Sequence, residues 1–356
     1  MSEFEEYKKL GEPDKKEKSE IWETAIGLQQ VDGLKPSNYL IDTAKSHIEG
    51  DITFEDVKNQ LSNYYKEKPA KMESEREELE ADIVSVRIAE ILSENAFSLS
   101  LVEFLSIHKR LFNGLFDFAG TIRTYNIEKK EWVLNSKSVT YGDFRNIQAY
   151  IKYDLQEEKK FSYKGLDKQE ILNHIADFTS RLWQIHAFGE GNTRTVAVFL
   201  IKYLKTLGFN IDNTLFAENS WYFRNSLVRA NYVDYANNIY ATNEFLIKFL
   251  ENLLFGGKNI LKNRYMHISF DTAKNQNDTV NDTLNNLDDT VKFKNDTVFS
   301  LIKENNNITA NEIANKLGKS LATIKRKLKD LKDRKVIARI GSDKTGCWKI
   351  LKDDEN

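Results

Sequence analysis

The stretch His186-Ala187-Phe188-Gly189-Glu190-Gly191-Asn192-Thr193-Arg194 decides how this chain folds, because it separates two segments with helical periodicity. Its histidine has the intrinsic pKa of a general base, and its glutamate offers oxygen ligands to a metal such as Mg²⁺. Glycines let an anion approach the backbone, and the N-terminus of the following helix favours negative charge. The combination predicts phosphate chemistry on a nucleotide.

Two further residues of the stretch fit this prediction. Asn192 is expected to cap the following helix. Arg194 lies in the first turn of that helix, where the helix dipole disfavours a cation, so it is expected to bind an external phosphate. A histidine alone in such a turn is more often structural, and the prediction rests on the whole set. His186 is the predicted base and Glu190 the metal ligand; the predicted nucleotide-binding residues are Gly189, Gly191, Asn192, Thr193 and Arg194.

The spacing of apolar residues predicts a largely helical chain. Ile171, Ile175, Phe178, Leu182 and Ile185 step by four and three, which predicts a helix over 168–185. The next helix follows the stretch and ends at Gly208. A β-hairpin is expected over 121–134, with a charged tip at 128–131. Other helices are expected over 72–95, 99–112, 142–156, 218–229 and 240–254, with three short ones between 19 and 65.

Composition agrees with a helical protein of two or three domains. The 356 residues include 40% hydrophobic residues, 3 prolines and 16 glycines, which disfavours a turn-rich all-β fold. Cys347 is the single cysteine, so no disulfide forms within the chain and a reducing compartment is expected. The sequence shows no signal peptide and no 18-residue apolar run, so a cytoplasmic location without membrane contact is expected.

Charge divides the chain into an acidic body and a basic tail. Residues 296–351 carry 13 lysines and arginines against 6 acids, a net of +7. Residues 352–356 carry −2, which leaves −7 for residues 1–295 within a total of −2. The predicted domains are a helical regulatory segment over 1–70, a core domain over 71–265, a polar low-complexity linker over 266–295 and a basic domain over 296–351.

The basic tail has the pattern of a winged helix-turn-helix. Thr309 with Glu312 predicts a capping box, and Gly318 predicts the turn. Two strands are expected over 336–340 and 347–350, around a wing. Such domains place their second helix in the DNA major groove, although some serve to dock proteins. The predicted DNA-binding residues are Thr323, Lys325, Arg326, Lys327 and Lys344.

HAFGEGNTR resembles the Fic/Doc signature HxFx(D/E)GN(G/K)RxxR, and the upstream stretch RLFNGLFDFAGTIRTYNI is also similar to a Fic domain. The resemblance covers residues 99–230. It implies a helical Fic core with a β-hairpin flap that holds a target protein by strand pairing. Fic proteins mostly transfer AMP from ATP to a protein hydroxyl, whereas Doc relatives transfer phosphate. The implied flap residues are Lys129, Lys130 and Trp132, although an exposed hairpin tip explains them equally well.

The chain departs from the family pattern at two positions. Thr193 stands where the signature has Gly or Lys, and Ala197 replaces the last arginine. In the family that arginine contacts the γ-phosphate and pairs with an inhibitory glutamate in the motif (S/T)xxxE(G/N). Residues 28–33 and 45–50 resemble this motif imperfectly, so Asp32 and Glu49 are the inhibitory candidates. Both are otherwise ordinary turns at helix ends. Without its usual arginine partner, the segment over 19–65 is expected to inhibit weakly.

Two functions follow from this resemblance. The first is a transferase that moves AMP from ATP, with Mg²⁺, to a Ser, Thr or Tyr hydroxyl of a protein, including itself. The alteration at Ala197 also leaves another donor, or transfer of phosphate, open. The second is a DNA-binding regulator whose core senses a nucleotide without turnover. The intact His186 and Glu190 favour the enzyme.

Overall fold

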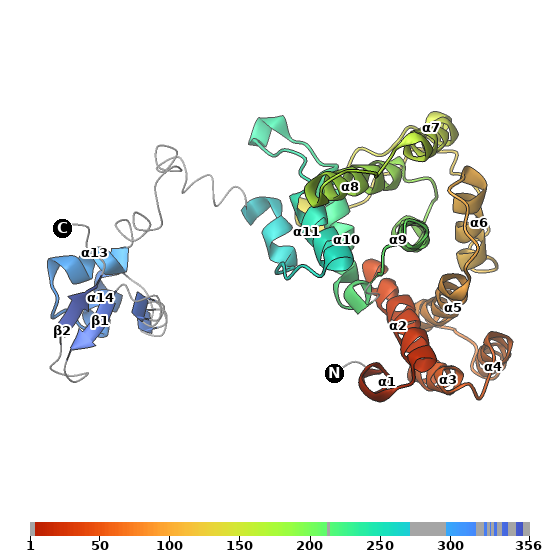
Figure 1. Cartoon of the computed structure of the whole chain (residues 1–356), viewed down its shortest axis with the longest axis horizontal. Helices are drawn as coiled ribbons and strands as arrows, with labels where there is room; N and C mark the ends of the chain where they lie inside the picture. The colour runs from red at the N-terminus through yellow and green to blue at the C-terminus, as the bar shows by residue number, and fades with distance from the viewer. Residues whose placement is uncertain are drawn as a thin grey trace. The chain divides into compact units, whose positions relative to one another are not determined.

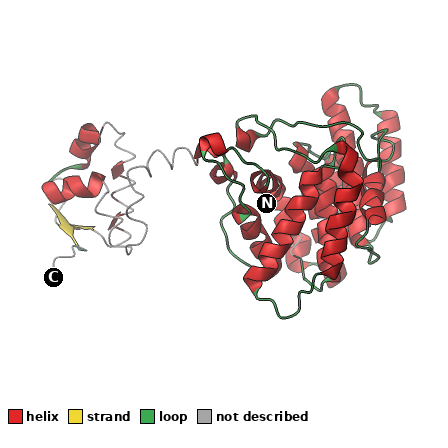
Figure 2. Cartoon of the chain, turned by 90° about the horizontal axis from the view of Figure 1, so that it is seen from above, coloured by secondary structure: helices red, strands yellow, loops and turns green. Residues whose placement is uncertain are grey.

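The computed structural model describes residues 4–211, 214–270 and 297–317, and beyond these residues 324–325, 328, 331–332, 337–340 and 347–351. The chain divides into two compact units, residues 1–273 and 274–356. The predicted linker over 266–295 lies mostly outside the described residues. The mainly helical fold class is confirmed (Figure 2).

The predicted short helices between 19 and 65 are confirmed. Ser37 caps one of them by accepting a hydrogen bond from the Leu40 amide, and Thr53 forms a capping box with Asp56. Trp22 is buried and donates from Nε1 to His47 Nδ1 at 3.1 Å, which joins the first long helix to the next. The elements are α1 (Glu5–Leu10), α2 (Pro13–Gly27), η1 (Leu28–Asp32), α3 (Asn38–Glu49) and α4 (Phe54–Glu67).

One helix, α9 (Asn192–Thr206), forms the centre of the first unit. It is buried from Asn192 to Leu204 on all sides, as its nearly continuous apolar sequence requires. Lys202, the buried lysine of α9, donates to the carbonyls of Ile91 and Glu94 at the end of α5. Figure 1 shows α9 surrounded by other helices. The other helices of this unit are α5 (Glu73–Ser93), α6 (Leu101–Phe112), α7 (Ile147–Lys160), α8 (Lys168–Ile185), α10 (Thr214–Ala230) and α11 (Glu244–Phe255). Of these, α5, α6 and α8 make the main contacts with α9.

The prediction of a β-hairpin over 121–134 is wrong. The described residues of this segment form no strand pair; the chain runs as a loop into η2 (Trp132–Leu134). The Arg123 amide pairs with the Ala187 carbonyl at 2.9 Å instead of with a second strand. Glu131 is fully buried and binds Arg224 of α10 through both oxygens, at 2.7 and 3.0 Å. Tertiary contacts therefore fix both ends of the segment and override its local strand preference.

The described residues of the second unit include two helices and the two predicted wing strands, whereas the predicted helix that begins at Ser320 lies mostly outside the described residues. The described elements are α13 (Thr297–Glu304), α14 (Ala310–Leu317) and an antiparallel pair of β1 (Ile337–Ile340) with β2 (Cys347–Ile350). The capping box of Thr309 and Glu312 is confirmed, with the Thr309 amide donating to Glu312 at 2.7 Å. Trp348 closes the core by donating from Nε1 to the Ile308 carbonyl. Lys325 is exposed, while Thr323, Arg326, Lys327 and Lys344 lie outside the described residues.

In the part of the chain that the structure describes, no helix has both the length and the apolar character that crossing a bilayer requires. The predicted boundaries at residues 70, 265 and 295 stay predictions.

Gly27 provides a test of how α2 packs on α10. A Cβ at this position would lie 2.3 Å from the Cα of Ala217, a backbone atom that cannot move aside. An alanine at a helical glycine usually stabilises a protein, but here overpacking should cost about 1–3 kcal/mol. We expect Gly27→Ala to lower the thermal unfolding midpoint. The matched control is Glu17→Ala on the exposed side of α2; an equal or higher midpoint for Gly27→Ala would contradict this packing.

Candidate active site

The turn between α8 and α9 begins at a residue with a left-handed backbone. His186 ends α8 at φ 51° and ψ 61°, a conformation that costs a non-glycine residue free energy. Arg123 holds this corner, since its Nε donates to the His186 carbonyl at 2.7 Å and its amide to the Ala187 carbonyl at 2.9 Å. Arg123 also donates to the carbonyls of Tyr125 and Gly142. The corner is therefore fixed from outside the turn.

Asn192 does not cap α9, in contrast to the sequence-based prediction. Gly191 is the residue before the helix, and Asn192 is its first residue. The Asn192 side chain accepts from the Phe188 amide at 2.9 Å and donates to the Phe188 carbonyl at 2.8 Å. A cap would satisfy one helix amide, whereas this pair satisfies two buried backbone groups of the turn. The amide thus closes the turn into a ring.

Gly191 is required by both conformation and space. Its φ is 75°, and a Cβ would lie 2.3 Å from the ring of Phe112. The first amides of α9 have no partner within the helix, and they start at this point. Only a glycine therefore lets the turn pack against Phe112, and the first residues of α9 are buried there.

The His186 imidazole is buried and unpaired. It is 4% exposed, and neither ring nitrogen has a hydrogen-bond partner among the described residues. The ring of Tyr141 covers it at a centroid distance of 4.0 Å. Burial lowers the pKa of His186 well below its usual value, and the charges of Lys129, Arg123 and Arg224 lower it further. The imidazole is therefore neutral at neutral pH and able to accept a proton.

His108 is a site residue that the sequence analysis missed. Its Nδ1 accepts from the Gly120 amide at 2.8 Å, so its Nε2 carries the proton and donates to the Glu190 carbonyl at 3.0 Å. Its ring stacks on Phe188 at 3.6 Å, and burial lowers its pKa to about 4. His108 thus holds the backbone of the predicted metal ligand. In the sequence, the one indication that His108 belongs to the site is its place on the buried face of the helix predicted over 99–112.

A cavity of about 480 Å³ opens beside Glu190. Its lining includes Gly189 and Glu190 from the turn, Lys129 and Lys130 from the 121–131 segment, and Arg224 from α10. Lys129 Nζ lies 2.7 Å from the Glu190 carboxylate. His186 is not among the lining residues.

Trp132 lies apart from this cavity. Its ring contacts that of Trp221 in a tilted arrangement at a centroid distance of 5.0 Å, and that of His267 edge to face at 4.9 Å. Lys129 and Lys130 therefore face the cavity, while the third predicted flap residue packs towards α10.

Two parts of the chain match models of known protein families. Residues 98–204 match the model of the Fic/DOC family, and residues 298–338 match a winged helix-turn-helix DNA-binding model. The first match contains the turn and both flanking helices. Residues 98–204 form a Fic domain.

The Fic domain is similar to part of the protein adenylyltransferase VbhT of Bartonella schoenbuchensis, with 31% identity over 106 residues. That match spans 30% of this chain and 21% of the length of VbhT.

Two solved structures of Fic proteins also match. One is the N-terminal Fic domain of the Bartonella sp. 1-1C effector Bep8, at 18% identity and a TM-score of 0.41, covering 51% of this chain and 87% of that one. The other is a Fic family protein of Desulfovibrio desulfuricans G20, at 13% identity and a TM-score of 0.41, covering 95% and 89%.

The motif arginine of the Fic domain is engaged within the protein. The Arg194 side chain is 2% exposed, and its guanidinium lies 2.9 Å from Asp32 and 2.7 Å from Glu80. Its Nη1 donates to Gln29 at 3.1 Å, and the ring of Phe112 lies 4.8 Å away. Thr193 is also buried and accepts from Trp183 Nε1. In this conformation neither side chain is open to a nucleotide.

The two inhibitory candidates occupy different places. Asp32, at the end of η1, reaches Arg194 directly. Glu49, at the end of α3, pairs with Lys15 at 2.7 Å, and this lysine lowers the pKa of its carboxyl. Only Asp32 of these two meets a residue of the Fic motif.

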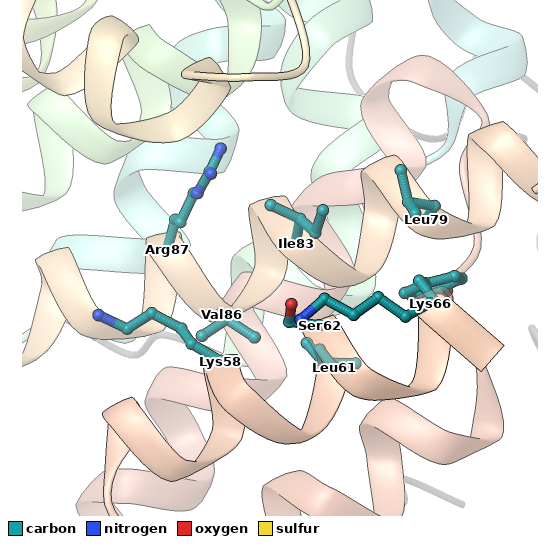
Figure 3. Close-up of a pocket in the computed structure, with 9 residues that line it drawn as sticks. Lys58, Leu61, Ser62, Lys66, Leu79, Ile83, Val86 and Arg87 are labelled. Carbon is teal, nitrogen blue, oxygen red and sulfur yellow. The ribbon is translucent and has the colours of Figure 1, made fainter. Parts of the chain in front are cut away.

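A second cavity, of about 410 Å³, lies between α4 and α5 (Figure 3). Leu61, Ile83 and Val86 give it apolar walls, and Lys58, Lys66 and Arg87 give it positive charge. None of its lining residues is a carboxylate or an imidazole, so it offers no acid–base pair. Of these two cavities, the one beside Glu190 is lined by residues of the turn.

We predict that the pKa of His186 lies well below that of a histidine in an unfolded chain, which is about 6.5, so that the ring stays neutral at neutral pH. An NMR titration, with the signal assigned through His186→Gln, measures this pKa. Lys129→Gln should raise the pKa because it removes the first of the three cations. A titration midpoint at the ordinary histidine value in the unmodified chain would contradict the buried geometry.

Proposed function

We propose that the Fic domain transfers AMP from ATP to a hydroxyl side chain of a protein, including this chain itself. The observation that carries the proposal is a buried, unpaired His186 at a fixed corner before α9, together with a cavity beside the turn. The charged residues that line this cavity are Lys129, Lys130, Arg224, Glu128 and Glu190. The similarity to a protein named as an adenylyltransferase supports it.

In the proposed reaction, His186 accepts the proton of the target hydroxyl. The hydroxyl oxygen bonds to the α-phosphorus, and the bond from this phosphorus to the bridging oxygen breaks, so that pyrophosphate leaves. The amides at the start of α9 stabilise the developing negative charge. Tyr141 has to move before a hydroxyl reaches the His186 ring, since it covers that ring at 4.0 Å.

The donor set fits Mg²⁺ bound together with nucleotide phosphates. The Glu190 side chain is 52% exposed and faces the cavity. The described residues contain no group of three or more His, Cys, Asp or Glu side chains that could bind a metal ion, and Mg²⁺ usually takes one or two carboxylates plus phosphates and water. Glu190 would hold the ion, which would neutralise phosphate charge when bound.

The second candidate function is a nucleotide-sensing regulator that binds DNA. The match of residues 298–338 to a winged helix-turn-helix DNA-binding model favours it. We propose that the second unit binds DNA with salt-sensitive affinity, whether or not the Fic domain turns over. A protein-docking role of this unit would instead show no salt-dependent DNA affinity.

His186→Ala should abolish labelling of protein by α-labelled ATP in a cell lysate, or lower it by about 100-fold or more, because the general base is lost. Mass spectrometry of labelled Ser, Thr and Tyr residues identifies the group that is transferred and separates AMP from phosphate. The matched control is His174→Gln, which keeps a hydrogen bond to Glu158 outside the cavity. Equal labelling by wild type and His186→Ala would contradict the proposal; salt-sensitive DNA binding without labelling would support the regulator.

We propose that Asp32 inhibits weakly, by holding Arg194 away from phosphate. Asp32→Asn should raise AMP transfer by less than about tenfold, because Glu80 and Gln29 still hold the guanidinium, and each such contact contributes about 1.5–3 kcal/mol. Asp32→Asn/Glu80→Gln should give a larger gain and a lower KM for ATP. Point variants are preferable to deletion of the segment, because α2 is part of the core.

Glu49→Gln is the matched control for this series, since its carboxylate pairs with Lys15. A large rise with Asp32→Asn alone would refute weak inhibition. An unchanged rate with lower stability in both variants would assign Asp32 a purely structural role.

A further inference from the structure

The cations that face the candidate active-site cavity come from outside the Fic motif. Arg194 is buried against Asp32 and Glu80, and Ala197 carries no charge. Neither residue lines the cavity, whereas Lys129, Lys130 and Arg224 do, together with the carboxylates of Glu128 and Glu190. The residues at the positions that bind phosphate in the family pattern therefore place no positive charge in this cavity.

We propose that Lys129 and Arg224 form the polyphosphate-binding site of the nucleotide in this chain. The inference rests on the proposed function and specifies how its substrate is held. The ligand class is a nucleoside triphosphate, whose phosphates would lie between the 121–131 segment and α10.

Position selects these residues, and their effect on His186 agrees with it. They line the cavity next to Glu190 and Gly189. The pKa of His186 is lowered by burial and then by Lys129, Arg123 and Arg224. Arg123 is occupied by backbone carbonyls, so only Lys129 and Arg224 both act on the proposed base and face the cavity. Phosphate bound here would offset their charge and restore the basicity of His186.

Arg224 is oriented in advance for this role. Glu131 is fully buried and binds both terminal nitrogens of Arg224, which fixes the plane of the guanidinium. These bonds use two of its five N–H donors, and the others are available to phosphate oxygens. A cation whose plane is fixed loses little freedom when it binds.

Before a nucleotide binds, Lys129 is paired with Glu190. Its ammonium lies 2.7 Å from the carboxylate, and the lysine side chain is 21% exposed. Binding of a polyphosphate would transfer the ammonium from the carboxylate to the phosphate. The freed carboxylate then becomes an oxygen ligand for the divalent cation that accompanies the nucleotide. Nucleotide binding and metal binding are therefore coupled through one lysine.

The test measures nucleotide affinity without turnover, by calorimetry on the full chain with His186→Ala and EDTA. Lys129→Gln should weaken ATP binding by about tenfold or more and leave adenosine binding unchanged. Glu131→Gln/Arg224→Gln should do the same without leaving a buried carboxylate unpaired. The matched controls, Lys168→Gln and Arg181→Gln, remove lysine and arginine ion pairs outside the cavity.

A double-mutant cycle tests whether Lys129 moves from Glu190 to the phosphates when ATP binds. Without metal, Glu190→Gln should tighten ATP binding because it releases the lysine, and this gain should be lost in Glu190→Gln/Lys129→Gln. If Glu190→Gln raises the ATP affinity equally with Lys129 and with Lys129→Gln, Glu190 acts only by repelling phosphate. That result would contradict the proposed move of Lys129 from Glu190 to phosphate.

ATP affinity that is unchanged by Lys129→Gln and by Glu131→Gln/Arg224→Gln would overturn the inference and leave the proposed transfer intact. The proposed transfer fails on a separate measurement, the His186-dependent labelling with metal present.

Discussion

The pair of hydrogen bonds between the Asn192 side chain and the backbone of Phe188 is the constraint on which the site depends. It joins the first residue of α9 to the middle of the turn, so that five residues behave as one rigid ring. Phe188 is thereby fixed under His108, and His108 in turn holds the Glu190 carbonyl. A single amide thus sets the position of the proposed metal ligand through two packed rings.

The N-terminal helices belong to the same core as the Fic domain. Trp22, Leu28 and Val31 are buried in one cluster with the residues of α9, and η1 brings Asp32 to the start of that helix. Arg194 is charged and 2% exposed, so it needs carboxylates around it whatever the function. An inhibitory contact and a stabilising contact are therefore the same ion pair, and kinetic measurements are needed to separate the two effects.

Sequence periodicity predicts α8 to the residue, because its buried face follows a regular step of three and four and Asp167 caps it. It fails where distant residues compete with local preference. Asn192 has the chemistry of a cap, but Phe188 offers it two buried partners instead of one. The 121–134 segment has the composition of a hairpin, but Glu131 is bound to Arg224, 93 residues away. The partners of Arg194 lie 114 and 165 residues away and leave no local signal.

The loss of the last motif arginine and the burial of the first are linked by charge. Positions 194 and 197 are three residues apart on α9 and so lie on neighbouring parts of its surface. Asp32 and Glu80 supply two carboxylates, and Ala197 is fully buried without a charge to balance either. Both carboxylates bind Arg194, which is the buried charge of the three and would otherwise lack a counterion. Lys129 and Arg224 are also paired with carboxylates, Glu190 and Glu131, but unlike Arg194 they line the cavity, which is why we propose them as the phosphate-binding residues.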